Sequence, residues 1–278
     1  MGASNFKKEF PNVLHNAYAR HKSELSRLQH VREIMSRVVV TIRPEATMQE
    51  AAVLMGKKHI GSLIVTRNGV SLGIITERDL LTKVLACGKD PAKESVEENM
   101  SYPLVTIGPE VKIKEAAETM YKKKGRLVVF DNGELIAIVT ASDLIRSMPE
   151  VPETQIQVDD FMTRTVVTAD EKTSVRTILK TMGEERIGSI VITRQGKPFG
   201  IFTERDLLSK IIVEDKTLDI PVVEVASSPL ITIPSGTSVH EAAATMAIKH
   251  IKRLPVAAPD GTLVGVITAR DLVEAYAR

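Results

Sequence analysis

Four short segments of the chain carry the same two side chains at the same spacing. They are GIITERD (Gly73–Asp79), AIVTASD (Ala137–Asp143), GIFTERD (Gly200–Asp206) and GVITARD (Gly265–Asp271). In each, a β-rich apolar run ends at a threonine and an aspartate follows three residues later, which is typical of a strand turning into a helix. A carboxylate at such a corner can accept hydrogen bonds from two vicinal hydroxyls, as in a ribose diol. The threonine hydroxyl and the free amides of the first helical turn can bind a phosphate.

The same Thr-x-x-Asp pattern also resembles a capping box, which stabilises a helix start by about 1 kcal/mol and binds nothing. A single copy favours the cap. Four copies after the same kind of strand favour ligand sites, although not necessarily four occupied ones. A cap and a ligand contact can coexist at one corner.

The four corners repeat along the chain at an almost constant interval. Their threonines lie at 76, 140, 203 and 268, so the intervals are 64, 63 and 65 residues. Such a period indicates one structural unit repeated four times. The first unit reads as a strand (Val38–Ile42), a helix from Met48, two strands (Ser62–Thr66 and Leu72–Thr76) joined at Arg67–Gly69, and a helix (Glu77–Ala86).

The sequence therefore predicts a mixed α/β fold (α+β) of four βαββα repeats. The predicted domains are an N-terminal basic helical extension (1–30) and repeats over 31–90, 91–150, 151–215 and 216–278, with a linker at Pro149–Gln157. Repeats one and three share Ile-Gly-Ser before the middle strand, whereas repeats two and four carry Arg126 and Arg253 there. This alternation predicts two equivalent halves, each built from two unlike repeats.

Bulk composition argues against several classes of protein. The chain has 278 residues, 43% of them hydrophobic, and a net charge of +2, which is too near neutral for a dedicated nucleic-acid binder. Its one cysteine permits no internal disulfide, and no apolar run approaches the roughly 20 residues that span a bilayer. We expect a cytoplasmic protein without a membrane span.

A repeat of about sixty residues that ends in Gly-h-h-Thr-x-x-Asp, paired in tandem, resembles the cystathionine-β-synthase (CBS) domain. The resemblance covers the chain from about Val31 to Tyr276, in a layout similar to the gamma regulatory subunit of AMP-activated protein kinase. It implies that repeats pair into Bateman modules whose clefts bind AMP, ADP, ATP or S-adenosylmethionine.

The resemblance also implies which residues meet in each cleft, with the Thr-x-x-Asp of one repeat facing the first strand of its partner. Thr76 and Asp79 would meet Tyr102, Pro103, Leu104, Val105 and Arg126, and Thr203 and Asp206 would meet Ser228, Pro229, Leu230, Ile231 and Arg253. Thr140 and Asp143 would meet Val38, Val39, Val40 and His59, and Thr268 and Asp271 would meet Val166, Val167 and Arg186. In this scheme the aspartates hold ribose, the first strands hold adenine, and the arginines and His59 hold phosphate.

Two details modify this scheme. Ala137 stands where the other corners have glycine, so we rank the Asp143 cleft lowest. Arg78, Arg205 and Arg270, just before three of the aspartates, are either phosphate ligands or solvated helix residues.

No catalytic centre or metal site is evident, so we predict a protein that is not an enzyme and has no catalytic cofactor. The predicted function is regulatory: an adenosyl ligand binds between repeats, and a protein partner reads its occupancy. The alternative is a scaffold or nucleic-acid-binding protein that uses the basic segment 1–30. The sequence leaves open whether the two modules form a monomeric disc or close across a homodimer.

Overall fold

The structure, a computed structural model, describes residues 28–147 and 156–278. Within these residues the strands form four three-stranded sheets with helices beside them, so the predicted mixed α/β fold of four repeats is confirmed. The predicted extension (1–30) lies outside the described residues apart from its last three, and so does most of the predicted linker.

Each repeat consists of a short strand, a helix, a hairpin and a second helix. Repeat one contains β1 (Thr41–Ile42), α2 (Met48–Lys58), β2 (Ser62–Arg67), β3 (Val70–Thr76), α3 (Glu77–Asp79) and the π-helix η2 (Leu80–Leu85). Repeat two contains β4 (Thr106–Ile107), α5 (Ile113–Lys123), β5 (Leu127–Asp131), β6 (Glu134–Val139) and α6 (Ala141–Ser147). Repeat three contains β7 (Thr168–Asp170), α7 (Val175–Glu184), β8 (Ser189–Arg194), β9 (Lys197–Thr203), α8 (Glu204–Asp206) and the π-helix η4 (Leu207–Ile212). Repeat four contains β10 (Ile233–Pro234), α9 (Val239–Lys249), β11 (Arg253–Ala257), β12 (Leu263–Thr268) and α10 (Ala269–Ala277).

All four sheets have the same connectivity. The first strand runs parallel to the second, and the second pairs antiparallel with the third. The predicted hairpin of repeat one turns at Asn68 (φ 51°) and Gly69 (φ 80°), the positive φ values that a tight two-residue hairpin turn requires. A short helical turn precedes each repeat: η1 (Val31–Glu33), α4 (Val96–Asn99), η3 (Val158–Asp160) and η5 (Val222–Glu224).

The first strand of repeat one is shorter than the sequence predicts. Val38–Ile42 is expected to form one strand, but β1 contains only Thr41 and Ile42. The preceding residues leave this sheet because Ser36 pairs with Ile138 on β6 of repeat two. Residues 38–40 are thereby placed beside the cavity described below.

Such exchanged pairings join the repeats in twos. In repeats one and two, Ser36 pairs with Ile138 and Ser101 pairs with Ile74. Repeats three and four show the same exchange between Thr163 and Val266 and between Ser227 and Ile201. Repeats one and two therefore form a first module, and repeats three and four a second one, which are the paired modules that the sequence predicts.

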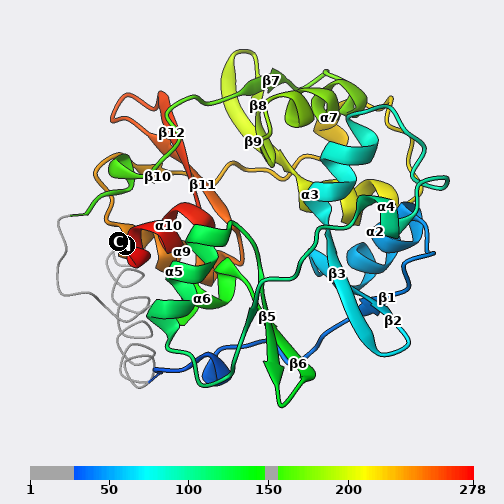
Figure 1. Cartoon of the computed structure of the whole chain (residues 1–278). Helices are drawn as coiled ribbons and strands as arrows, with labels where there is room; N and C mark the ends of the chain where they lie inside the picture. Colours follow the sequence, from blue (N-terminus) through cyan, green and yellow to red (C-terminus); the bar gives the residue numbers. More distant parts are fainter. Residues whose placement is uncertain (1–27, 148–155) are drawn as a thin grey trace, which may run out of the picture.

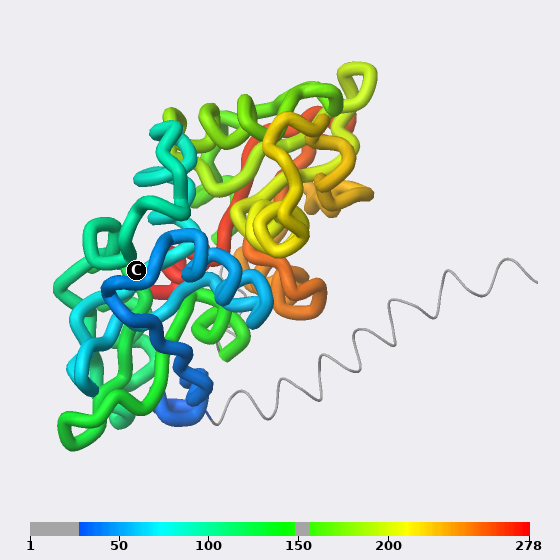
Figure 2. The backbone as a smooth tube through the Cα atoms, turned by 90° about the vertical axis from the view of Figure 1, so that its right-hand side faces the viewer, coloured from blue at the N-terminus to red at the C-terminus, as the bar shows by residue number. Residues whose placement is uncertain are grey.

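The two modules pack against each other within this one chain through their helices. Helix α2 lies on η4 and α7 on η2, which builds one core from repeats one and three. Helix α5 lies on α10 and α6 on α9, which builds a second core from repeats two and four. The two helical groups are separate in Figure 1, and Figure 2 shows the first module (blue to green) beside the second (yellow-green to red). Fully buried side chains such as Met55 and Phe202 each contribute roughly 1.5–3 kcal/mol by leaving water.

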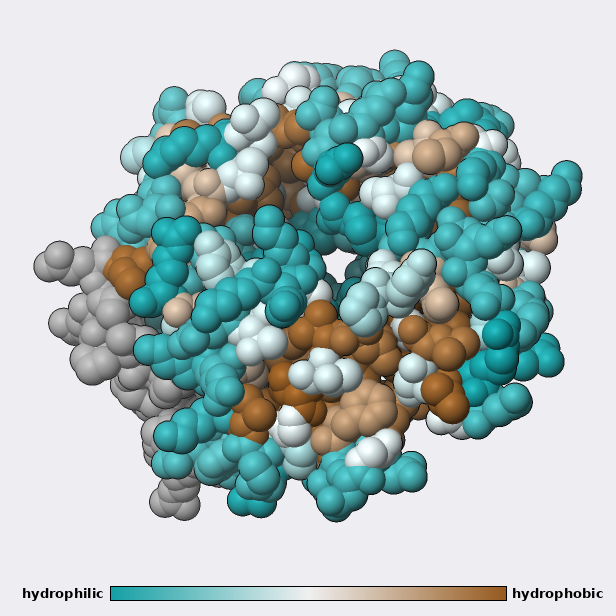
Figure 3. Space-filling model, viewed as in Figure 1, coloured by the Kyte–Doolittle hydropathy of each residue, from teal (hydrophilic) through white to brown (hydrophobic). Residues whose placement is uncertain are grey.

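Between the modules, the molecule has an opening at its centre. Figure 3 shows it bordered largely by hydrophilic residues, whereas apolar residues gather over the lower part of the same face. Hydrophilic residues therefore border much of this opening, although the elements around it are packed through apolar cores.

Candidate ligand-binding cavity

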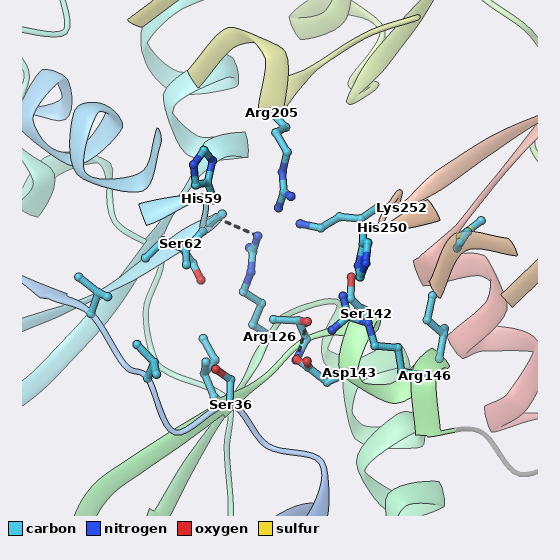
Figure 4. A pocket seen from close by; sticks show the side chains of 18 of the residues that line it. Ser36, His59, Ser62, Arg126, Ser142, Asp143, Arg146, Arg205, His250 and Lys252 are labelled. Carbon is cyan, nitrogen blue, oxygen red and sulfur yellow. Dashed lines mark hydrogen bonds between the residues drawn. The ribbon is translucent and has the colours of Figure 1, made fainter. Parts of the chain in front are cut away.

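A cavity of about 290 Å³ lies where all four repeats meet. One lining residue from each repeat illustrates this: His59, Asp143, Arg205 and Lys252. In Figure 4 these side chains come from different elements and point toward a common space. The volume is at the lower end of the range found for small-molecule sites.

The Thr140–Asp143 corner forms one wall of the cavity. Asp143 Oδ2 accepts hydrogen bonds from the backbone nitrogen of Thr140 at 2.8 Å and from its hydroxyl at 2.6 Å. These bonds tie the end of β6 to the start of α6 and make one half of a capping box; at the other three corners the aspartate amide also donates to the threonine hydroxyl. No partner within the described ranges occupies Asp143 Oδ1, and the residue is only half-buried. The capped carboxylate therefore keeps one oxygen for a ligand.

An apolar segment lies beside this carboxylate, as the sequence predicts for the Asp143 cleft. Val38, Val39 and Val40 all line the cavity. The backbone nitrogen of Ile64 donates to the Val40 oxygen at 3.0 Å, which fixes the segment next to β2. Val38 is 76% exposed, so it presents an apolar surface that a flat ring could cover.

Cationic side chains form another part of the lining. Arg126, Arg146, Arg205 and Lys252 border the cavity. Arg126 Nη2 donates to the Gly61 oxygen at 2.8 Å, so the guanidinium crosses from repeat two to repeat one. Figure 4 shows Arg126, Arg205 and Lys252 converging from three repeats. Such a group of donors suits an anion with several oxygens.

Two histidines border the same space because they end equivalent helices. His59 ends α2 and His250 ends α9 in the left-handed conformation, with φ of 54° and 53°. Both are exposed residues that line the cavity. The sequence analysis groups His59 with Asp143, and the structure brings the two to one cavity.

A buried glutamate counters part of the cationic charge. Glu77 Oε1 lies 3.7 Å from Lys252 Nζ and 4.0 Å from Arg126 Nη2, and its side chain is 9% exposed. Burial alone would raise the pKa of Glu77, but the charges of Lys252, Arg126 and Arg205 hold it below its ordinary value. Burial, with repulsion from the arginines, lowers the pKa of Lys252 despite the attraction of Glu77.

The Ile-Gly-Ser motif of repeats one and three makes room for these ion pairs. A Cβ on Gly61 would lie 2.8 Å from Glu77 Oε1 and 3.0 Å from Arg126 Nη2. A Cβ on Gly188 would lie 2.5 Å from Glu204 Oε2. A larger residue at either position would have to push these charged groups aside.

Glu204 forms the equivalent cluster in the second module. It pairs with Arg253 at 3.4 Å and with Arg78 of the first module. Arg78 Nη1 also donates to the backbone oxygen of Arg186 at 2.8 Å. Arg78 and Arg253, both predicted phosphate ligands, thus have protein partners in this structure.

Asp79 and Asp206 have more partners than Asp143. Their Oδ2 atoms cap Thr76 and Thr203 as at the other corners. Their Oδ1 atoms lie 2.8 Å and 2.7 Å from the amines of Lys83 and Lys210.

The Asp271 corner resembles that of Asp143. Asp271 Oδ2 accepts from the backbone nitrogen and the hydroxyl of Thr268, both at 2.7 Å. Burial raises the pKa of Asp271, although these two hydrogen bonds act to lower it. Burial also lowers the pKa of Arg270. Arg270 Nη2 donates to the Lys124 oxygen at 3.1 Å and so reaches the first module.

The residues predicted to face Asp271 lie in two other segments of repeat three. Arg186 adopts a positive φ of 54°, and Val166 and Val167 lie before β7.

The other predicted first-strand segments lie before β4 and β10. Tyr102 is 73% exposed and Ile231 39% exposed, so both segments offer apolar surface at their modules' edges. The Val105 oxygen accepts from Val128 of β5, and the Leu230 nitrogen donates to Phe199 of β9. Pro103, Leu104, Ser228 and Pro229 lie in the same two segments.

Two features of the cavity bear on the sequence prediction. It lies at the Asp143 cleft, which the sequence ranks lowest because of Ala137; this residue is fully buried in the core and is not among the residues that line the cavity. Arg126, assigned from the sequence to the Asp79 cleft, also lines this cavity. At the other corners, the glycine lets the backbone of the neighbouring repeat approach closely. For example, a Cβ on Gly73 would lie 2.9 Å from the backbone oxygen of Ser101.

Sequence reasoning does not identify several lining residues, namely Ser36, Ser62, Ser142, Arg146, His250 and Lys252, nor Glu77, the buried counter-charge of Lys252. The sequence does hold a signal for the buried glutamates. Repeats one and three have glutamate directly after the corner threonine (TERD), whereas repeats two and four have alanine there (TASD and TARD). In the described parts of the chain, no group of three or more His, Cys, Asp or Glu residues could hold a metal ion. No helix within those parts is long and apolar enough to cross a membrane.

A family model described as "CBS domain" matches residues 31–86, 94–150, 158–213 and 222–278. The chain therefore belongs to the CBS-domain family, with four copies of the domain. The CBS domain-containing protein YhcV of Bacillus subtilis is 34% identical over 118 residues, which is 42% of this chain and 84% of that protein.

Longer relatives match nearly the whole chain. The uncharacterized protein MJ1225 of Methanocaldococcus jannaschii is 25% identical over 272 residues, covering 86% of this chain and 95% of that protein. Its crystal structure, described as a candidate archaeal homologue of γ-AMPK, aligns with a TM-score of 0.74 at 23% identity over 89% of this chain and 99% of its own. An uncharacterized conserved protein from Pyrococcus horikoshii aligns with a TM-score of 0.62 at 24% identity over the same shares. These structures share the fold of this chain.

Proposed function

We propose that this CBS-domain protein is a non-catalytic regulatory sensor that binds an adenine nucleotide and passes its occupancy to a protein partner. The observation that carries the proposal is the composition of the cavity at Asp143. An apolar segment, a carboxylate oxygen without a protein partner and a group of cations border one space. These are the surfaces that a base, a ribose and a phosphate respectively require.

Each part of a nucleotide has a counterpart in this arrangement. The base packs on Val38–Val40, and Asp143 Oδ1 accepts hydrogen bonds from the ribose diol. The phosphates face Arg126, Arg205 and Lys252. AMP, ADP and ATP are the ligands that the CBS family suggests, with S-adenosylmethionine as a further candidate; it offers the cations one carboxylate in place of phosphate oxygens.

The location of the cavity supports a regulatory role. Because residues of both modules line it, a bound ligand contacts both and favours the module arrangement in which all contacts are made. A ligand shifts such an equilibrium only through its differential affinity for the two arrangements. A partner protein that binds one arrangement better would then respond to the ligand.

The proposal is tested by measuring nucleotide binding to the full chain by calorimetry and by thermal shift, with AMP, ADP, ATP, S-adenosylmethionine and GMP as ligands. A ligand that binds only the folded state raises the melting temperature by mass action. Asp143→Asn is the informative variant, because an amide oxygen can still cap Thr140 while the amide NH₂ replaces the ribose acceptor. We expect it to weaken AMP binding at this cavity at least tenfold.

Asp131→Asn is the matched control, because it removes the same charge from an exposed residue at the end of β5. It is expected to leave nucleotide affinity unchanged. If none of the adenine nucleotides binds, or if Asp143→Asn binds AMP as the unaltered chain does, the proposed site is wrong.

A further inference from the structure

The four Thr-x-x-Asp corners differ in how many hydrogen-bond positions their carboxylates have left. An ionised carboxylate has about four acceptor positions, two on each oxygen. At every corner one oxygen is used by the capping threonine, through its backbone nitrogen and its hydroxyl. The second oxygen therefore decides whether the corner can accept two ribose hydroxyls.

At Asp79 and Asp206 the second oxygen is already occupied. Asp79 Oδ1 lies 2.8 Å from Lys83 Nζ and accepts from the Ser101 hydroxyl at 3.1 Å. Asp206 Oδ1 lies 2.7 Å from Lys210 Nζ and accepts from the Ser227 hydroxyl at 2.8 Å. Each of these carboxylates thus accepts three hydrogen bonds from the protein, and an ion-paired ammonium group lies against its second oxygen.

The two lysines are held from several sides. Lys83 Nζ also donates to the Asn99 oxygen at 2.7 Å, and Lys210 Nζ donates to the Val225 oxygen at 2.9 Å. The paired carboxylates have only 8% and 7% of their side chains exposed. A ribose could enter only by displacing an ammonium group from a buried carboxylate, which leaves a charge unpaired.

The corners of Asp143 and Asp271 lack this occupant. The residue four positions later is Ser147 in repeat two and Ala275 in repeat four. Ser147 is buried and donates to the Leu144 oxygen instead, and alanine has no donor. In the part of the chain that the structure describes, the Oδ1 atoms of both aspartates have no hydrogen-bond partner.

The lysine, and not the serine, distinguishes the two kinds of corner. Ser101 and Ser227 lie on segments paired with the last strand of the neighbouring repeat, and Ser36 and Thr163 hold the equivalent positions for the other two corners. A hydroxyl is therefore present beside all four corners. Only repeats one and three have a lysine four positions after the aspartate.

The geometry points to Lys83 and Lys210 as residues that close two of the four clefts, so that nucleosides bind only at Asp143 and Asp271. Each chain then takes two ribosides instead of four, one in each module. The alternation of repeats thus gives each module one binding cleft and one closed cleft. One repeat supplies the open corner, and the other supplies the closed corner and the buried glutamate. This inference rests on the proposed function and specifies which clefts perform it.

The test is the stoichiometry of AMP binding to the full chain by calorimetry at saturating AMP. We expect two AMP molecules per chain, one after Asp143→Asn, one after Asp271→Asn, and none after both. A stoichiometry of three or four, or two sites that survive the double variant, overturns the assignment of the clefts while leaving the sensor function intact. Absence of AMP, ADP and ATP binding in the unaltered chain overturns the sensor function and this inference together.

A second arm opens the closed corners. Lys83→Ala with Lys210→Ala frees the Oδ1 positions of Asp79 and Asp206, and we expect the stoichiometry to rise above two. Lys180→Ala is the matched control, because Lys180 makes an exposed i,i+4 pair with Glu184 at 3.8 Å. An unchanged stoichiometry in a folded double variant contradicts the role of the lysines. If that variant does not fold, the aspartate variants still decide which clefts bind AMP.

Discussion

Lys252 Nζ lies 3.7 Å from Glu77 Oε1, although the two residues belong to different modules and are 175 positions apart in the chain (252 − 77). The same glutamate faces Arg126 of its own module. One carboxylate thus balances cations from both halves of the molecule at the edge of the cavity. Changes at this point are expected to affect stability and anion binding together.

Removal of the Glu77 charge should destabilise the protein. Glu77→Gln leaves Lys252 and Arg126 without their shared counter-charge, and breaking such a buried pair costs about 3 kcal/mol. Urea unfolding of the variant should show this loss in the free energy of unfolding. Glu45→Gln, which removes an exposed partner of Arg67, is the control and should leave that free energy nearly unchanged.

Acid should weaken the folded state partly through the same residue. The cations around Glu77 lower its pKa below the ordinary 4.5, so its stabilising contribution is complete above that value. The contribution is lost as the pH falls through the pKa in the folded state. Between about pH 6 and about pH 3, Glu77→Gln should therefore lose less stability than the unaltered chain. Equal losses in both proteins would contradict this role of Glu77.

Nucleotide binding at the cavity should weaken in alkali. The pKa of Lys252 is lowered in the free protein, and a bound phosphate stabilises its charged form. Affinity for AMP should therefore fall as the pH rises from about 7.5 through the pKa of free Lys252, a range in which the phosphate itself, with a second pKa of about 6, stays ionised. Calorimetry across this range should show the fall in the unaltered chain, and a Lys252→Met variant should bind more weakly with a flatter pH profile.

A methyl group at Gly61 should disturb the charged cluster. The added Cβ would press on Glu77 and Arg126, and overpacking of this kind costs about 1–3 kcal/mol. Gly108→Ala is the control, because a Cβ there meets nothing within 4 Å. We expect the Gly61→Ala variant to melt at a lower temperature than the control and to bind AMP more weakly. A melting temperature equal to that of the control would show that the cluster can move aside.

Local patterns in the sequence were enough to predict the repeated unit. The apolar run before Thr76 makes a strand, and the aspartate three residues on caps the next helix through contacts that span only three positions. Asn68–Gly69 specifies its hairpin through the φ values of those two residues. Such interactions depend on neighbours in the chain, and they recur in all four repeats because the residues recur.

The sequence also predicts the meeting of Asp143 with Val38–Val40 and His59, because the CBS resemblance supplies the pairing of repeats. It does not reveal which corner stays open. Lys83 is visible four residues after Asp79, but a lysine there could equally extend into solvent. Its position is decided by Asn99 and Ser101, which the exchange between repeats brings beside it.

The sequence by itself determined the class of fold, the four corners and the alternation of two kinds of repeat. All three depend on residues that lie close together in the chain. The tertiary structure alone decided where the cavity lies and which charges surround it. Arg126 reaches Gly61 of another repeat, and Lys252 reaches Glu77 of another module. The first contact forms only when the two repeats of a module pair, and the second only when the two modules pack; no local pattern records either kind of packing.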